Sequence, residues 1–488
     1  MNAQTLLLLT LIAIPIIAYS QDQSKNGSPI VTTESELAVL GQLTLAPAEV
    51  IDLTDDPEND LAISKILADL PVSVAQANTQ QTPIDNRNGV VYIANIEPGP
   101  HGDIDGINLR TVVRKGTLIE EQDWLWESSV IEDRTIHDQW HTAPSIATDK
   151  DGFVHIAYNM HNLPWQYKVS DEPDSIEGFE FRGEKIKQSE LENLHFDNQV
   201  NFSTLGKADI PGNLITYPAF FKDRQNDLYV TYRFAARPKR PHTERTFSSG
   251  IAKYDSKKKS WNSIGSEIDV TRKDRSRSFW APSVSVAFAS SLGWTSYRPY
   301  LVFDSSNRMH ANWYWRKGTS GALVTRPCYL VSENQIDFYD ADGKQYTLPV
   351  NPENCGNTAT SATKEFYNIG NTAINSKNDV YMVRSPNEEK RQLLHYDTNA
   401  SQWSAEESPY SASELFFDSN DNAWAIGSGL KILRKKAGET FWTLLYANEN
   451  KADCLPRVSQ NADKTIAYIH TQSCESYDSI SVYSITTN

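Results

Sequence analysis

The segment PSIATDKDGFVHIAY, from Pro144 to Tyr158, contains the pattern that decides the fold. Its proline is followed five positions later by Asp149, and five positions later again by the apolar Val154. Each copy of this frame predicts two β-strands joined by a polar turn. The frame recurs twice, at Pro218, Asp223 and Leu228 and at Pro299, Asp304 and Met309.

Weaker copies extend the repeat along the chain. They are centred on Val380, Trp424 and Ile466, and a first copy ends in Val90–Ile93, which makes seven in all. The spacings of 44 and 42 residues between the last three match one four-stranded propeller blade. The sequence therefore predicts an all-β fold, a seven-bladed β-propeller. Six or eight blades are the alternatives in the count, and an irregular β-sandwich is the alternative architecture, although it predicts no repeated Pro-to-Asp frame.

The charge of the chain is unevenly distributed. In 488 residues, 46 Lys and Arg face 62 Asp and Glu, and this net charge of −16 argues against a general nucleic-acid binder. Residues 21–85 hold 11 acidic side chains against two lysines, a net −9, which leaves about −7 for the rest of the chain. Locally basic surfaces can therefore exist on the main domain.

Three regions follow from these patterns: a signal peptide at 1–20, an N-terminal acidic extension at 21–85 that acts as a linker and docking segment, and a catalytic propeller at 86–488. Within the extension, one apolar patch ended by Pro71 predicts a short helix; its members are Leu61, Ile63, Ile66, Leu67 and Leu70.

The first residues of the sequence predict a cleaved secretion signal. Leu6 to Ile17 is apolar but too short to span a bilayer, and Ala18-Tyr19-Ser20 has the small residues that signal peptidase prefers. Met1 to Thr5 lacks Lys and Arg, which weakens the match. We expect an extracellular or periplasmic protein without a membrane partner.

The four cysteines occur late in the chain. In a secreted protein they predict two local disulfides, Cys328 with Cys355 and Cys454 with Cys474. The alternative is a structural metal site formed by Cys328, Cys355 and His242, although no tight spacing of ligands supports it.

Polar side chains with useful chemistry occur at the open ends of three hairpins. If the turns are centred on residues 151, 225 and 306, residues equidistant from each centre face each other across the ladder. The facing pairs are then His141 with His161, Tyr217 with Arg233, and Arg298 with Tyr314. His155 lies inside a strand, where a structural histidine is the more frequent case.

This set of side chains can hold an anion and move a proton. An adjacent Arg favours the phenolate of a Tyr, and histidine carries protons near neutrality. The combination suits removal of the C5 proton of a uronic acid, with Arg233 neutralising the carboxylate and a donor assisting the leaving sugar. Arg298 and Tyr314 would help to bind the substrate.

Two basic segments follow the same hairpins. RFAARPKRPHTER contributes Arg237 and Arg240, and TRKDRSRSFW contributes Arg275. In an acidic protein they predict contacts with an anionic polymer, although such runs are as often solvated faces. Nearby tryptophans can stack on sugars, but core packing is their commoner role; these are Trp140, Trp165 and Trp280.

The segment from His141 to Ser170 resembles the signature of BNR-repeat propeller proteins. The histidine pair, followed by Tyr217 and Arg233 sixteen residues apart, is similar to the pattern of the ulvan lyases built on seven-bladed propellers. The resemblance covers most of 89–488. It implies that Tyr217 acts with His141 or His161 as base and acid, and that Arg233 neutralises the carboxylate.

The resemblance also implies the substrate and the cofactors. The substrate would be ulvan, a sulfated rhamnose and uronic acid polymer cleaved by β-elimination to leave an unsaturated uronate. No cofactor would be required for the chemistry, and family members can carry a structural zinc or calcium ion. A sialidase-like glycoside hydrolase is one alternative, but its Ser-x-Asp-x-Gly-x-Thr-Trp box does not occur here. A non-catalytic carbohydrate-binding propeller is another.

Overall fold

A computed structural model describes residues 48–56, 59–72, 81–99, 109–120, 123–135, 141–183, 185–186, 204–205, 210, 215–235, 247–269, 284–317, 324–356, 368–385, 391–448, 453–473 and 478–487. All of them belong to one compact unit, 42–488. The predicted signal peptide lies outside the described residues. No helix in the described ranges is long and apolar enough to cross a membrane.

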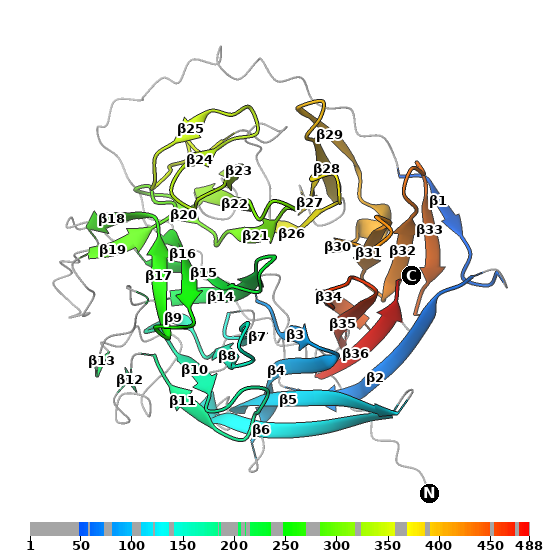
Figure 1. Cartoon of the computed structure of the whole chain (residues 1–488), viewed down its shortest axis with the longest axis horizontal. Helices are drawn as coiled ribbons and strands as arrows, with labels where there is room; N and C mark the ends of the chain where they lie inside the picture. The colour runs from blue at the N-terminus through cyan, green and yellow to red at the C-terminus, as the bar shows by residue number, and fades with distance from the viewer. Residues whose placement is uncertain are drawn as a thin grey trace, which may run out of the picture. The chain divides into compact units, whose positions relative to one another are not determined.

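Within this unit the chain forms a seven-bladed β-propeller, as the repeat predicted. Figure 1 shows the innermost strands of the seven blades around a common centre. The blades follow one another in chain order, and most strands pair with a strand that is adjacent in sequence.

The first four blades contain the strands nearest the predicted site. Blade 1 contains β3 (Ile84–Arg87), β4 (Val90–Pro98), β5 (Leu109–Glu120) and β6 (Asp123–Thr135). Blade 2 contains β7 (Ser145–Thr148), β8 (Val154–Ala157), β10 (Tyr167–Ser170) and β11 (Phe179–Phe181). Blade 3 contains β14 (Ile215–Lys222), β15 (Leu228–Ala235), β16 (Phe247–Asp255) and β17 (Ser260–Ile264). Blade 4 contains β21 (Tyr300–Phe303), β22 (Met309–Lys317), β23 (Val324–Ser332), β24 (Phe338–Tyr339) and β25 (Gln345–Tyr346).

The other three blades complete the ring. Blade 5 contains β26 (Asn368–Ile374), β27 (Val380–Ser385), β28 (Gln392–Asp397) and β29 (Gln402–Glu407). Blade 6 contains β30 (Glu414–Phe417), β31 (Ala423–Gly427), β32 (Lys431–Lys435), β33 (Trp442–Tyr446) and the parallel β1 (Val50–Asp52). Blade 7 contains β34 (Asp453–Gln460), β35 (Ile466–Ser473), β36 (Ser479–Thr486) and β2 (Ala62–Pro71).

Short elements connect or extend the blades. They are β9 (His161–Leu163), which pairs with β14, the pairs β12 (Lys185–Ile186) with β13 (Thr204–Leu205) and β18 (Ser266–Asp269) with β19 (Val284–Ala287), β20 (Thr295–Ser296), and the 3-10 helix η2 (Pro409–Ser411). Strand β20 pairs with both β16 and β22, so it joins blades 3 and 4.

The predicted helix at Leu61–Leu70 is wrong, because this segment is strand β2. It pairs antiparallel with β36 and closes the last blade with an N-terminal strand. The ladder shifts register between Lys65 and Leu67 and again between Leu67 and Leu70. Each shift changes the phase of a period-two pattern, which explains why the apolar positions imitated helical spacing. Both β1 and β2 are therefore propeller strands rather than parts of a linker.

The Asp of the repeat stabilises the turn of the first hairpin in blades 2, 3, 4 and 6. In blade 2, Asp149 Oδ1 accepts the backbone N–H groups of Asp151 and Phe153, at 3.0 and 2.9 Å. Its Oδ2 lies 3.2 Å from His155 Nε2, six residues later. The same two backbone contacts recur at Asp223, Asp304 and Asp418, and also at Asp340 in the outer hairpin of blade 4. His155 is thus a buried structural residue, as its place inside a strand suggested.

Replacing Asp149 by Ala should destabilise the propeller by about 2–4 kcal/mol, because two N–H groups of the turn and the buried His155 lose their acceptor. Burial raises the pKa of Asp149, but the hydrogen bonds from His155 and the backbone outweigh it and leave this pKa below its ordinary value. The stabilisation is therefore complete above about pH 4 and fades as the pH falls further. Urea unfolding measures the difference. The neighbouring exposed Asp151→Ala is the control, and an equal loss in both variants would contradict this role.

Candidate active site

The two predicted histidines meet at the end of blade 2 opposite the Asp149 turn. The rings of His141 and His161 stack with centroids 3.9 Å apart and an interplanar angle of 7°. They are not partners in one ladder, since His161 begins β9 and pairs with Thr216 of β14. The backbone carbonyl of His141 accepts a hydrogen bond from Gln81 Nε2 at 3.1 Å. Two imidazolium ions would repel each other at this distance, which disfavours double protonation of the pair.

Tyr217 lies beside this pair in a strained backbone conformation. Its φ angle is 57°, in the left-handed region that a bulky residue rarely adopts. The ladder between β14 and β15 shifts register between Thr216 and Ala219, so Tyr217 and Pro218 together form a bulge. Bulges re-aim side chains next to functional sites. This bulge places the Tyr217 ring 5.5 Å from that of His141.

Arg233 projects from β15 into a cage of aromatic rings. Its guanidinium carbon lies 4.6 Å from the ring centroid of Tyr217, 4.5 Å from that of Phe247 and 5.3 Å from that of Tyr297. The side chain is buried, and its Nε atom has no hydrogen-bond partner in the described parts of the chain. These rings hold the cation in place.

In the second and third hairpins, the residue that faces the predicted partner lies one position earlier in the sequence than expected. The turn centres are confirmed by ladder partners such as Phe221 with Tyr229 and Leu301 with Ala311. Beyond the bulges, however, Arg233 pairs with Thr216, so Tyr217 reaches Arg233 by its side chain rather than across the ladder.

Tyr297, which the sequence analysis missed, takes the place predicted for Arg298. Its backbone N–H donates to the Tyr314 carbonyl at 3.0 Å, and the two rings stack with centroids 4.3 Å apart. The Tyr297 ring also lies 6.1 Å from that of Tyr217, and its hydroxyl accepts from Arg316 Nη1 at 3.3 Å. The sequence analysis assumed an unbroken ladder and therefore singled out the neighbouring Arg298. An irregularity at Arg298 and Pro299 shifts the register by one residue.

Arg298 does not face Tyr314 across the ladder as predicted, because Tyr297 takes that position. Its guanidinium carbon lies 5.5 Å from the ring of Phe221 and 5.9 Å from that of Tyr300, near the propeller axis. The one-residue shift turns it to the other side of the strand, because alternate residues point to opposite faces. Tyr314 is buried and stacks on Tyr297, which stacks in turn on Tyr217, so the three rings form an aromatic row.

Burial determines the protonation state of Tyr217. It raises the pKa of Tyr217 to about 12, even though the Arg233 charge acts in the opposite direction. The expectation that the arginine would favour the phenolate is therefore wrong for the unliganded protein: desolvation outweighs the cation. Tyr217 is a phenol at neutral pH, able to donate a proton.

The other side chains that the sequence predicted to contact the substrate or a metal ion either lie in the core or fall outside the described residues. Trp165 is fully buried in the core, so it cannot stack on a ligand. Outside the described residues lie Arg237, Arg240, Arg275, His242, Trp140 and Trp280.

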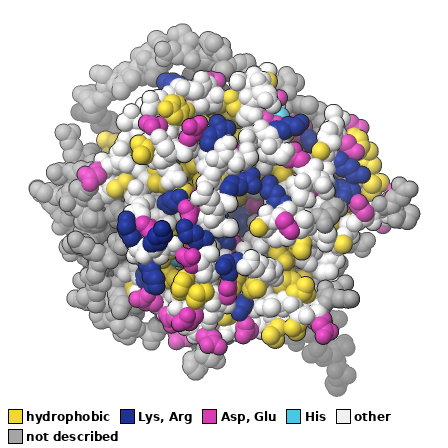
Figure 2. All heavy atoms as spheres, viewed as in Figure 1, with side chains coloured by type: hydrophobic (Ala, Val, Ile, Leu, Met, Phe, Trp, Pro, Cys, Tyr) yellow, Lys and Arg dark blue, Asp and Glu magenta, His cyan; other side chains and the backbone are white. Residues whose placement is uncertain are grey.

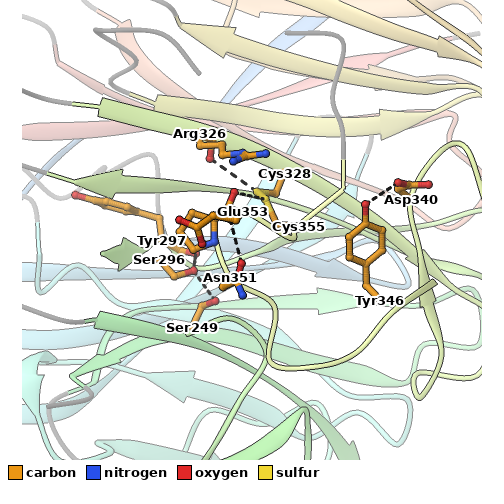
Figure 3. Close-up of a disulfide and its surroundings, with 11 residues drawn as sticks. Ser249, Ser296, Tyr297, Arg326, Cys328, Asp340, Tyr346, Asn351, Glu353 and Cys355 are labelled. Atoms are coloured by element: carbon orange, nitrogen blue, oxygen red, sulfur yellow. Dashed lines mark hydrogen bonds between the residues drawn. A yellow bond between two sulfur atoms is a disulfide. The ribbon is translucent and has the colours of Figure 1, made fainter. Parts of the chain in front are cut away.

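The metal site proposed for Cys328 and Cys355 is wrong, because the two form a disulfide with Cα atoms 5.5 Å apart. Figure 3 shows Cys328 on its strand and Cys355 on the segment that packs against it. Neither sulfur is a free thiolate, so neither can bind zinc. No group of three or more metal-binding side chains occurs among the described residues. Cys454 is also disulfide-bonded, whereas Cys474 lies outside the described part of the chain.

The repeat and the ring of blades agree with a match to a known family. A model described as BNR repeat-containing family member matches residues 104–409. The chain belongs to this family. No curated protein matches the sequence.

Two solved structures of an ulvan lyase share the propeller of this BNR-repeat protein. Both are described as a new family of polysaccharide lyase, and one of them is bound to a repeat of glucuronic acid and sulfated rhamnose. Each is 13% identical and covers 86% of this chain and 95% of its own, with TM-scores of 0.50 and 0.51. At this identity the likeness concerns the fold alone.

Proposed function

We propose that this protein is a secreted polysaccharide lyase that cleaves ulvan, a sulfated polymer of rhamnose and uronic acid, by β-elimination. The observation that carries the proposal is the caged guanidinium of Arg233 beside a phenol and an imidazole pair. The ulvan lyases that share the fold support the choice of substrate.

Arg233 would neutralise the uronate carboxylate. When the C5 proton leaves, negative charge spreads into this carboxylate, and a fixed cation in a buried site stabilises it strongly. The contacts of Arg233 in the described part of the chain are with aromatic rings, and we assign its charge to the substrate carboxylate. A guanidinium can bind both carboxylate oxygens at once.

The histidines and Tyr217 would divide the proton transfers. A neutral ring of the His141 and His161 pair removes the C5 proton. The electron pair forms the C4–C5 double bond, the bond from C4 to the linking oxygen breaks, and Tyr217 donates its hydroxyl proton to that oxygen. The raised pKa of Tyr217 suits the donor role rather than that of a base.

The pH profile tests this assignment. Since kcat/KM follows the free enzyme and the pKa of Tyr217 lies at about 12, the alkaline limb should fall above pH 10, because the donor stays protonated until then. The acidic limb should reflect protonation of the imidazole that acts as the base. Initial rates of ulvan cleavage are measured across this pH range for the native protein and for Tyr217→Phe. A steep alkaline loss below pH 9 that depends on Tyr217 would contradict the donor role.

The requirement for the carboxylate can be tested on the substrate. Ulvan whose uronates have been reduced to neutral sugars should not be cleaved, because neither the acidic C5 proton nor the partner of Arg233 remains. Desulfated ulvan should still be cleaved, with a higher KM if basic loops bind sulfate. Equal cleavage of native and carboxyl-reduced polymer would refute the proposal.

A further inference from the structure

A pocket of about 550 Å³ lies at the end of the propeller where the turns of the repeat meet. Residues of these turns line it, among them Asp149 of blade 2 and Asp223 of blade 3. Lys222 lies at the same end, five residues after Tyr217 along β14, which corresponds to roughly 16 Å along the strand. This turn pocket is therefore separate from the candidate active site.

Cationic side chains surround the turn pocket. Figure 2 shows Lys and Arg side chains gathered around the middle of one face of the propeller. Those that line the pocket are Arg87, Lys150, Lys222, Arg224 and Lys464. Three of the five form ion pairs at 2.6–2.7 Å, namely Arg87 with Asp174, Lys150 with Asp227 and Lys222 with Asp85. These three are therefore parts of the wall.

The carboxylates in the pocket wall are bonded to donors of the protein. Asp85, Asp149 and Asp223 are all buried. Asp85 Oδ2 accepts from Lys222 Nζ at 2.6 Å and from Thr148 Oγ1 at 2.8 Å. The Oδ1 atoms of the other two accept backbone N–H groups of their own turns. All three carboxylates thus have structural partners.

The other two cations, Arg224 and Lys464, form no ion pair within the described part of the chain. Arg224 Nε donates to the backbone carbonyls of Phe303 and Asp304, at 3.2 and 3.3 Å. These contacts position the guanidinium without neutralising its charge. The Lys464 amine makes no hydrogen bond with a described residue. Both side chains therefore have N–H donors to offer to a ligand.

The surroundings of Lys464 disfavour its charge. Burial lowers the pKa of Lys464, and the charge of Arg224 adds to this effect, while Asp421 and Asp418 oppose it. Both carboxylate oxygens of Asp421 are already bonded to Ser376, at 2.8 and 2.9 Å. Arg224 and Lys464 come from blades 3 and 7 and repel each other, so an anion bound between them would relieve this repulsion.

Uncharged groups of the turn pocket suit the hydroxyls of a sugar. Asn88 and Asn226 are exposed at turn positions with φ angles of 52° and 59°. Each side-chain amide offers donors and an acceptor, as a hydroxyl requires. The volume of the pocket also lies within the roughly 300–1,000 Å³ of small-molecule sites.

We propose that the turn pocket is a second, non-catalytic binding site for a saccharide that carries sulfate or carboxylate groups. Arg224 and Lys464 bind the oxyanion, and Asn88 and Asn226 bind sugar hydroxyls. The choice of a saccharide rests on the proposed function, whereas the pocket and its two cations do not. Through this site the protein would hold the acidic polymer on the face opposite to the one that cleaves it.

The test titrates the full-length protein with a sulfated uronate oligosaccharide prepared by acid hydrolysis of ulvan. Calorimetry should show a class of site that persists in Arg233→Ala, because the turn pocket does not include Arg233. A crystal soaked with the oligosaccharide should show it between Arg224 and Lys464. If elimination failed but this binding persisted, the proposed reaction alone would be refuted, so the two proposals can fail separately.

Variants identify the groups that bind. In the Arg233→Ala background, Arg224→Gln and Lys464→Gln should each raise the Kd of the oligosaccharide about 10–100-fold, the effect of losing a charged hydrogen bond. Lys258→Gln removes the same charge from an exposed turn of blade 3 and should leave Kd unchanged. Cleavage of short oligosaccharides should stay within about twofold of normal in Lys464→Gln.

Two simpler anions test the class of ligand. Inorganic sulfate and glucose 6-phosphate should bind at least tenfold more weakly than the oligosaccharide, because the first lacks hydroxyls and the second lacks a further sugar. Equal affinity for either would contradict a saccharide site. Loss of all oligosaccharide binding in Arg233→Ala, or binding that is insensitive to both Arg224→Gln and Lys464→Gln, would overturn the proposal.

Discussion

Replacing Arg233 by Ala is expected to lower kcat/KM on ulvan by about 10²–10³-fold, the effect of removing one preorganised donor from a developing anion. The loss should appear mainly in kcat, because the charge on the carboxylate grows as the C5 proton leaves. Steady-state rates over a range of polymer concentrations separate kcat from KM.

The aromatic cage around Arg233 provides the control for this variant. Truncation leaves a space between Tyr217, Phe247 and Tyr297, which methylguanidinium can fill. Adding this ion should restore part of the activity of Arg233→Ala, whereas methylammonium, which lacks the planar fork, should restore less. Near-normal turnover of Arg233→Ala would remove Arg233 from the mechanism.

Tyr217→Phe should lower kcat by about 10²–10⁴-fold, because general acid catalysis by a positioned side chain contributes this much. Phenylalanine keeps the ring against His141 and Arg233, so the fold and the affinity for the polymer should change little. Rates and binding are measured on the same preparation.

Tyr314→Phe is the matched control, since Tyr314 stands in the same aromatic row but behind Tyr297. It should retain activity within about tenfold, as a residue that packs but transfers no proton. If the two variants lost activity equally, the hydroxyl of Tyr217 would have no special role.

The propeller could be predicted because its repeat has a local physical cause. Asp149 and its counterparts accept the same turn N–H groups in several blades, so the spacing is visible in a single sequence. The turn centres then gave the correct ladder partners close to each turn. The disulfide between Cys328 and Cys355 was also predicted, from the spacing of the cysteines and the expected secretion.

The details of the site could not be predicted, because they depend on bulges. The left-handed Tyr217 and the irregularity at Pro299 each shift a ladder by one residue, which brings Tyr297 into the site and sends Arg298 to the axis. Strand β2 was misread for the same reason. Likewise, the protonation of Tyr217 follows from burial, which a linear sequence does not reveal.

Elimination is tested most directly by digesting ulvan in water enriched in heavy oxygen while following ultraviolet absorbance. The account predicts products that absorb, because each cut creates a double bond conjugated with the uronate carboxylate, and that carry no heavy oxygen at the new ends. New reducing ends without absorbance, labelled by solvent oxygen, would indicate hydrolysis and would contradict the account.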